Sequence, residues 1–99
     1  MRLVWTILAS VDRKAIRVYI AQNNPAAALA LDELISEKGS RLVDHPDLGR
    51  LGRVPGTREL VVHQNFILIY DTVGDRLRIL RVLHAARQWP PTPARDRGG

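Results

Sequence analysis

The sequence predicts an α+β domain in which a helical hairpin packs on a largely antiparallel four-stranded sheet, in the order β-α-α-β-β-β. Two observations support this fold class. Apolar residues recur at helical spacing through residues 11–43, and they alternate or run unbroken, as in strands, in residues 2–7 and 58–84. Strands that stand before and after a block of helices are typical of α+β folds. A chain of 99 residues is long enough for one domain, which we assign to residues 1–89.

Residues 2–7 are rich in Val, Trp and Ile and are predicted to form the first strand. Ser10 is a candidate N-cap, because its side-chain oxygen could accept a hydrogen bond from the first turn of a helix. That helix is predicted over residues 11–23. We expect Trp5 and Tyr19 to lie in the core rather than to stack on bases, since large aromatic side chains are usually mostly buried.

The second helix has a start signal in Asn24-Pro25. Asn24 is predicted as its N-cap, and Pro25 suits the first turn because proline has no N–H group to leave unpaired. The apolar stripe continues over residues 26–43, where Gly39 is expected to end or bend the helix. The short connection between the two helices predicts an antiparallel hairpin.

The second half of the chain is predicted to hold a long loop and three strands. Residues 44–57 combine Gly, Pro and Asp with arginines, which is typical of a loop. Strands are predicted over residues 58–63, 66–72 and 76–84, paired as a meander, and the unbroken run Phe-Ile-Leu-Ile-Tyr favours a central strand covered on both faces. The place of the first strand in the sheet stays open. Residues 90–99 have no large apolar side chain to bury and are predicted to be disordered.

The chain carries a net charge of +5 at pH 7 and has a pI of about 10.7. Most of the positive charge is arginine, since only Lys14 and Lys38 are lysines. The planar guanidinium group suits phosphate and carboxylate partners, so the composition favours a nucleic acid, a ribosome or an acidic protein as partner. The alternative is a basic surface that serves solubility alone.

Several kinds of site are excluded by what the sequence lacks. No cysteine is present, which rules out disulfides and thiolate metal sites and fits a reducing cytoplasm. The three histidines, at 45, 63 and 84, show no metal-ligand spacing, and no glycine-rich phosphate loop is present. No stretch reaches the ~18 consecutive apolar residues that a membrane span requires. We therefore predict a cytoplasmic protein with no cofactor, no metal and no membrane partner.

Seven short motifs follow one another along the first nine-tenths of the chain. They are Trp5, Tyr19-Ile20, Asn24-Pro25, Leu42…Pro46…Gly49, Arg58-Glu59-Leu60, Ile67-Leu68-Ile69-Tyr70 and Arg81-Val82-Leu83-His84-Ala85-Ala86-Arg87. In the order and spacing of these motifs, the chain resembles the RelE/ParE superfamily of toxins from bacterial type II toxin–antitoxin modules. The resemblance covers residues 1 to about 89 and implies the RelE/ParE-like version of the α+β fold described above.

The resemblance implies a toxin that arrests growth and is neutralised by a cognate antitoxin. It leaves the target open, because RelE-like toxins cut mRNA on the ribosome whereas ParE-like toxins inhibit DNA gyrase. We narrowly favour ribosome-dependent mRNA cleavage, with gyrase inhibition as the alternative and a degenerate toxin that only binds antitoxin as a third. The antitoxin is expected to lay an apolar helix on the helical hairpin or to add a strand to a sheet edge. A homodimer and a heterotetramer with the antitoxin both stay open.

RNA cleavage requires a base for the 2′-OH, a charge that stabilises the phosphate and an acid for the leaving oxygen. The resemblance implies that Arg58 stands where RelE-like nucleases carry a basic residue, and Arg87 where they carry the phosphate-stabilising arginine. His84 is a candidate acid or base because histidine titrates near neutrality; a bond from its ring to a backbone carbonyl is the alternative. Ile67 replaces a further arginine of those nucleases, and Trp89 is the aromatic nearest to a missing tyrosine. The nuclease set is therefore incomplete.

Arginines around the long loop and on the late strands are predicted to bind nucleic-acid phosphates. The residues assigned to this surface are Arg50, Arg53, Arg58, Arg78, Arg81 and Trp89. For the loop arginines the alternative is a merely solvated loop. For Arg81 and Trp89 the alternative is a contact with the antitoxin, and for Arg87 it is an ion pair with a neighbouring loop.

Overall fold

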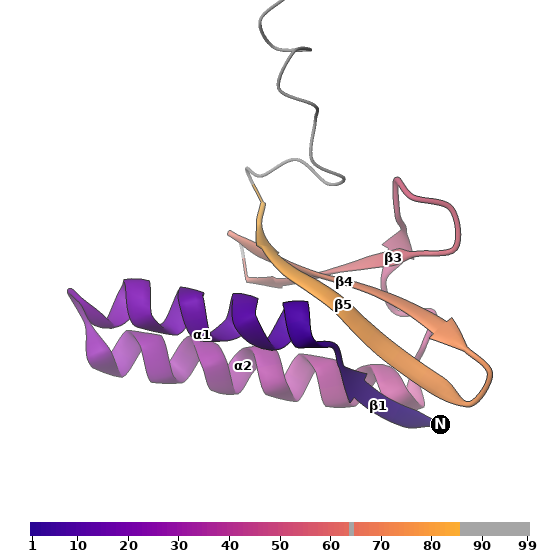
Figure 1. The fold of residues 1–99 in the computed structure, drawn as a ribbon, viewed down its shortest axis with the longest axis horizontal. Coiled ribbons are helices and arrows are strands. Elements are labelled where there is room, and N and C mark those ends of the chain that lie inside the picture. The colour runs from indigo at the N-terminus through magenta and orange to yellow at the C-terminus, as the bar shows by residue number, and fades with distance from the viewer. Residues whose placement is uncertain (64, 86–99) are drawn as a thin grey trace, which may run out of the picture.

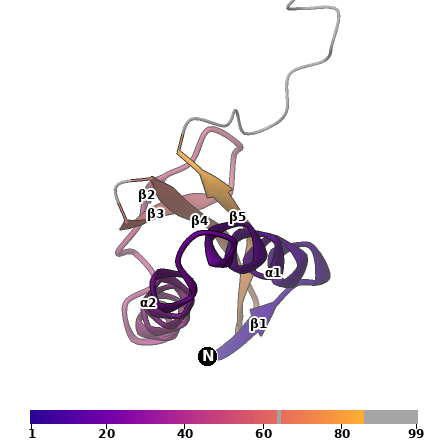
Figure 2. The same ribbon diagram turned by 90° about the vertical axis from the view of Figure 1, so that its left-hand side faces the viewer.

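Two helices cover one face of a mixed sheet in the computed structural model, which describes residues 1–63 and 65–85 (Figure 1). Within these residues the elements are α1 (Ile7–Ala21), α2 (Pro25–Asp44), β1 (Arg2–Trp5), β2 (Arg50–Leu51), β3 (Arg58–His63), β4 (Phe66–Val73) and β5 (Arg76–His84). The strand order is β1-β5-β4-β3-β2. The helices lie side by side, as an end-on view shows (Figure 2). The predicted α+β fold class is confirmed, and the structure adds the short strand β2 inside the segment predicted as a loop.

The three late strands form the predicted meander, with β3 antiparallel to β4 and β4 antiparallel to β5. β3 and β5 have their predicted bounds, and β4 runs one residue further than predicted. β1 lies parallel to β5, with Arg2 opposite Arg76 and Trp5 opposite Ile79. β2 pairs with the start of β3 and forms the other edge of the sheet. The structure therefore supplies the position of β1 that the sequence left open.

Helix α1 begins earlier than predicted, and its N-cap is Thr6 rather than Ser10, so that prediction was wrong. The Thr6 hydroxyl accepts a hydrogen bond from the Ala9 N–H at 3.2 Å and donates one to the Ile79 carbonyl at 2.8 Å. Because β1 ends at Trp5, Thr6 joins the start of the helix directly to β5. This contact spans most of the chain, which is why the local sequence does not reveal it.

Helix α2 begins as predicted. The Asn24 side chain accepts a hydrogen bond from the Ala27 N–H at 3.0 Å, and Pro25 occupies the first turn. Gly39 does not end the helix, which continues for another turn, so an end at this position, one of the two expected effects, is contradicted. A Cβ atom at Gly39 would lie 2.8 Å from Cζ2 of Trp5. The glycine therefore serves the close approach of the indole ring rather than a break in the helix.

The main core lies between the helices and the sheet. Its fully buried members include Ala9, Ile35, Leu42, Leu68, Tyr70, Leu77 and Ile79. A second, smaller cluster, formed by Ile67, Ile69 and Leu83 with Leu80 packed against it, lies on the other face of the sheet because successive strand residues point to opposite sides. Strand β4 is thus buried on both faces, as its unbroken apolar run predicts.

The two aromatic residues of the N-terminal segment lie in different surroundings. Trp5 packs against the main core, as predicted, with the guanidinium carbon of Arg13 4.4 Å from its ring centroid. Tyr19 is 73% exposed, so its prediction as a core residue was wrong. In the described part of the chain no helix is long and apolar enough to cross a membrane. The tail at 90–99, predicted to be disordered, lies outside the described residues.

Candidate functional site

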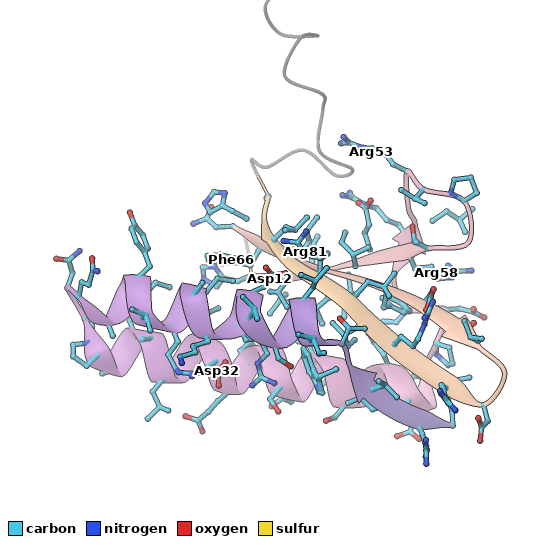
Figure 3. All side chains as sticks on the ribbon, viewed as in Figure 1. Asp12, Asp32, Arg53, Arg58, Phe66 and Arg81 are labelled. Carbon is cyan, nitrogen blue, oxygen red and sulfur yellow. The ribbon has the colours of Figure 1, made fainter. Side chains whose placement is uncertain are left out.

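Arg81 on β5 is held by Asp12 of α1. Its Nε and Nη2 atoms donate to the two carboxylate oxygens at 2.8 and 3.0 Å, and the Val82 N–H donates to the same carboxylate at 2.9 Å. Figure 3 shows the two side chains together where the helix passes β5. Only 20% of the Arg81 side chain and 12% of the Asp12 side chain are exposed. The hydrogen bond to Asp12 also raises the pKa of Arg81. Arg81, predicted to bind phosphate, therefore joins α1 to the sheet.

Arg78 is engaged in the same way by Asp71, its register partner on β4. Its Nε atom donates to Oδ1 at 2.9 Å and its Nη2 atom to Oδ2 at 2.6 Å. This hydrogen bond and the charge of Asp71 raise the pKa of Arg78 above its ordinary value. Both arginines that the predicted phosphate surface takes from β5, Arg78 and Arg81, therefore have a carboxylate partner within the chain.

The arginines of the loop between α2 and β3 differ in how they are held. Nη2 of Arg50 lies 3.1 Å from Oε1 of Glu59. The Glu59 side chain, 7% exposed, also accepts a hydrogen bond from the backbone N–H of Arg53 at 3.3 Å. The Arg53 side chain extends outward from the loop, with no ion pair or hydrogen bond to another described residue (Figure 3). Arg53 is thus available for a partner.

Arg58, the predicted catalytic arginine at the start of β3, turns back toward the loop. Its Nη1 atom donates to the Gly49 carbonyl at 2.7 Å, and its Nη2 atom lies 3.5 Å from Oδ1 of Asp47. Gly49 is itself fixed by Tyr70, whose hydroxyl accepts from the Gly49 N–H at 2.9 Å and donates to the Pro46 carbonyl at 2.6 Å. Burial raises the pKa of Tyr70, which keeps the hydroxyl protonated as a donor. The buried Tyr70 side chain therefore fixes the loop at Pro46 and Gly49, and through Gly49 it positions Arg58.

The two predicted catalytic residues that the structure describes, Arg58 and His84, lie apart. Arg58 is opposite Tyr70 in the sheet, whereas His84 is opposite Phe66. Those two positions on β4 are four residues apart, which corresponds to about 13 Å along a strand at ~3.3 Å per residue. The His84 ring packs edge-on against Phe66, with centroids 5.2 Å apart. Two further predicted site residues lie outside the described part of the chain, Arg87 and Trp89.

Sequence reasoning missed an apolar surface beside α1. One hollow of about 310 Å³ lies between α1 and the end of β5, and a second of about 360 Å³ lies between the helical hairpin and the turn from β3 to β4. Phe66 lines both hollows. Tyr19 of α1 lines the first hollow. Helix α1 exposes more than half of five large apolar side chains, those of Ile7, Leu8, Val11, Val18 and Tyr19. The signal in the sequence is that apolar residues occupy more of this helix than one core-facing stripe needs.

Comparison with known proteins places this fold in a family. A family model described as ParE toxin of type II toxin–antitoxin system, parDE, matches residues 3–89. Toxin RelE2 of Caulobacter vibrioides is 36% identical over 86 residues, which cover 87% of this chain and 97% of that protein. A chain of the chromosomal ParDE TA system from P. aeruginosa shares 31% identity at a TM-score of 0.77, over 85% of this chain and 95% of that one. A YoeB/ParE toxin from Agrobacterium tumefaciens shares the fold, at 21% identity and a TM-score of 0.61 over 85% of this chain and 98% of that one.

These similarities define the class of protein, a toxin of a type II toxin–antitoxin system. Within that class, the chain belongs to the ParE toxin family. The superfamily resemblance recognised in the sequence is confirmed, and membership of the family implies a cognate antitoxin as partner.

Proposed function

We propose that this toxin arrests growth by binding DNA gyrase, the alternative that the sequence left open, rather than by cutting mRNA on the ribosome. The observation that carries the proposal is the separation of Arg58 from His84. Their partners on β4, Tyr70 and Phe66, are about 13 Å apart along the strand. RNA cleavage requires an acid, a base and a stabilising charge within hydrogen-bond reach of one phosphate. Arg58, turned back toward Gly49, and His84 at the far end of β4 do not meet that requirement. An inhibitor that acts by binding needs no such convergence.

Two further features support a protein rather than an RNA as the target. Arg78 and Arg81 are already paired with carboxylates of the chain, which removes two charges that would otherwise neutralise RNA phosphates. Ile67, at the position where RelE-like nucleases carry an arginine by the resemblance, lies in the small apolar cluster on the outer face of the sheet. An apolar centre with paired charges around it suits contact with protein better than contact with a phosphate backbone.

Under this proposal, gyrase rather than the ribosome responds to the purified toxin. We expect inhibition of supercoiling with accumulation of cleaved DNA, and intact ribosome-bound mRNA in cell-free translation. His84→Gln should leave the half-inhibitory concentration within about threefold of wild type, because no proton transfer is involved, whereas loss of a general acid or base costs an enzyme ~100-fold or more. Unaffected supercoiling together with cleaved mRNA would overturn the proposal.

For the antitoxin we propose an amphipathic helix that lies along the exposed side of α1, the first of the two binding modes expected from the sequence. Leu8, Ala15 and Tyr19 recur at helical spacing on the side of α1 that borders the hollow at Phe66. Leu8 and Tyr19 are 58% and 73% exposed, so a partner helix would remove a continuous apolar strip from water. Lys14, exposed on the same helix, and the net charge of +5 favour acidic residues on that partner.

The double variant Leu8→Asp/Tyr19→Asp tests this docking surface. Antitoxin affinity, measured by calorimetric titration, should fall by about 30-fold or more, because apolar contacts are lost and an acidic partner is repelled. Toxicity without antitoxin should persist, since both side chains are exposed and contribute little to the fold. The matched control is Leu29→Asp on α2, where the leucine is also 58% exposed. Wild-type antitoxin affinity in the double variant would contradict the docking surface.

A further inference from the structure

We propose that the loop between α2 and β3, residues 45–57, is a preformed recognition element through which the toxin contacts its protein target. Leu51 and Arg53 are its contact residues, and the surface that they fit is an acidic protein surface in which an apolar hollow lies beside a carboxylate. This inference rests on the proposed function, because it takes the target to be a protein. The loop is here called the recognition loop.

Buried side chains attach the recognition loop to the sheet at two places along residues 46–53. At the first, the hydroxyl of the fully buried Tyr70 binds the Pro46 carbonyl at 2.6 Å and the Gly49 N–H at 2.9 Å. At the second, which follows directly, the buried Glu59 carboxylate binds the Arg50 side chain at 3.1 Å and the Arg53 N–H at 3.3 Å. A loop held in this way loses little conformational entropy when a partner binds.

The tip of the recognition loop is closed by its own hydrogen bonds. The Gly52 N–H donates to the Thr57 carbonyl at 2.8 Å, and the Thr57 N–H and hydroxyl both donate to the Val54 carbonyl, at 3.1 and 2.6 Å. Thr57 is 7% exposed, and a Cβ atom at Gly52 would collide with its hydroxyl. Gly56 takes a positive φ of 85°, which glycine adopts without strain. The tip is thus a folded turn rather than a loosely solvated segment.

On this fixed frame the recognition loop presents apolar side chains to solvent. Leu51 is 78% exposed and Leu48 is 49% exposed. Arg53, two positions beyond Leu51, extends outward without a partner in the described part of the chain (Figure 3). A large apolar side chain beside an unpaired guanidinium group offers both area to bury and a charge to satisfy, and arginine is enriched among the residues that dominate binding energies. Charge complementarity then requires a carboxylate on the partner.

The recognition loop and the proposed antitoxin surface lie on different parts of the molecule. β2, which forms part of the loop, is the outermost strand on one edge of the sheet, and β5, next to α1, is separated from it by β3 and β4 (Figure 2). Substitutions in the loop should therefore change target binding without changing antitoxin binding. This separation makes the inference testable.

The test uses the full chain with Leu51→Ser/Arg53→Ser. We expect its potency in gyrase supercoiling, and its growth arrest on induction, to fall by about 30-fold or more. Antitoxin affinity and Tm should stay at wild-type values, because both side chains point into solvent. The matched control removes the same two side-chain types from α2, as Leu29→Ser/Arg41→Ser, and should retain full toxicity.

Growth arrest separates this inference from the proposed function, since that measurement requires no knowledge of the target. If wild-type toxin spares gyrase, the proposed function fails, while loss of growth arrest in the loop variant alone still supports the loop as the contact. If the double variant arrests growth like wild type, the inference is overturned. Should the double variant be unstable, Arg53→Glu decides: retained toxicity overturns the inference, and lost toxicity at unchanged Tm supports it.

Discussion

Replacing Asp12 with alanine is expected to lower the free energy of unfolding by about 4 kcal/mol, as measured by urea denaturation. The Arg81 guanidinium would remain between α1 and β5, where its side chain is only 20% exposed, without the carboxylate that binds it at 2.8 and 3.0 Å. The Val82 N–H would lose its partner at the same time. Removing one member of a mostly buried ion pair is costly because the charge that stays behind is poorly solvated.

Two comparisons isolate that cause. Asp71→Ala breaks the same two-bond geometry at Arg78, whose side chain is 40% exposed, and should cost much less stability than Asp12→Ala because water replaces the lost partner. Adding Arg81→Leu to Asp12→Ala should restore at least half of the lost stability, since no unpaired charge remains. A loss of less than about 1 kcal/mol in Asp12→Ala would contradict the assigned role of the pair.

Substituting Gly49 with alanine is expected to lower the free energy of unfolding by about 3 kcal/mol, from overpacking and disturbed hydrogen bonds together. A Cβ atom there would lie 2.8 Å from Cε1 of Tyr70 and 2.9 Å from the Glu59 carbonyl oxygen. The tyrosine ring is fully buried and the carbonyl belongs to β3, so neither yields without disturbing the core or the sheet. Relief of the overlap would also shift the hydrogen bonds of Gly49 to Tyr70 and Arg58.

The control for this effect is Gly56→Ala in the same loop. Gly56 has a φ of 85° but nothing within 4 Å of an added Cβ atom, so only the backbone conformation is penalised, by about 1 kcal/mol. Urea denaturation of both variants compares close packing with conformational strain in one loop. Equal losses in the two variants would show that the contacts of Gly49 are not the cause.

Signals between near neighbours were sufficient to predict α2 and the late strands. Asn24 caps α2 through a hydrogen bond to a residue three positions away, so its role can be predicted from a short stretch of sequence. The apolar run from Phe66 predicted β4 and its burial on both faces. By contrast, the cap of α1 depends on packing against β5 through Thr6, and Ser10 satisfies the same local rule without being the cap.

The candidate site could be predicted only in part. The sequence singled out Arg58, Arg78 and Arg81 as cations for an external phosphate, but each has a partner within the chain. The sequence does not distinguish a free arginine from one that is ion-paired in the fold. Asp12, for example, is 69 positions away from Arg81, the arginine that it binds. The exposure of Tyr19 was missed because helical spacing gives the sides of a helix but not which side meets the sheet.

By itself, the sequence determined the fold class, the RelE/ParE superfamily and the bounds of the elements whose signals are local, because periodicity, caps and motif spacing act over a few residues. Only the tertiary structure decided where β1 pairs, which arginines are neutralised, and that Arg58 and His84 stand at opposite ends of β4. Each of these outcomes depends on contacts between residues far apart in the chain. Such contacts are chosen by packing and charge pairing in the folded state, which leave no mark on local sequence.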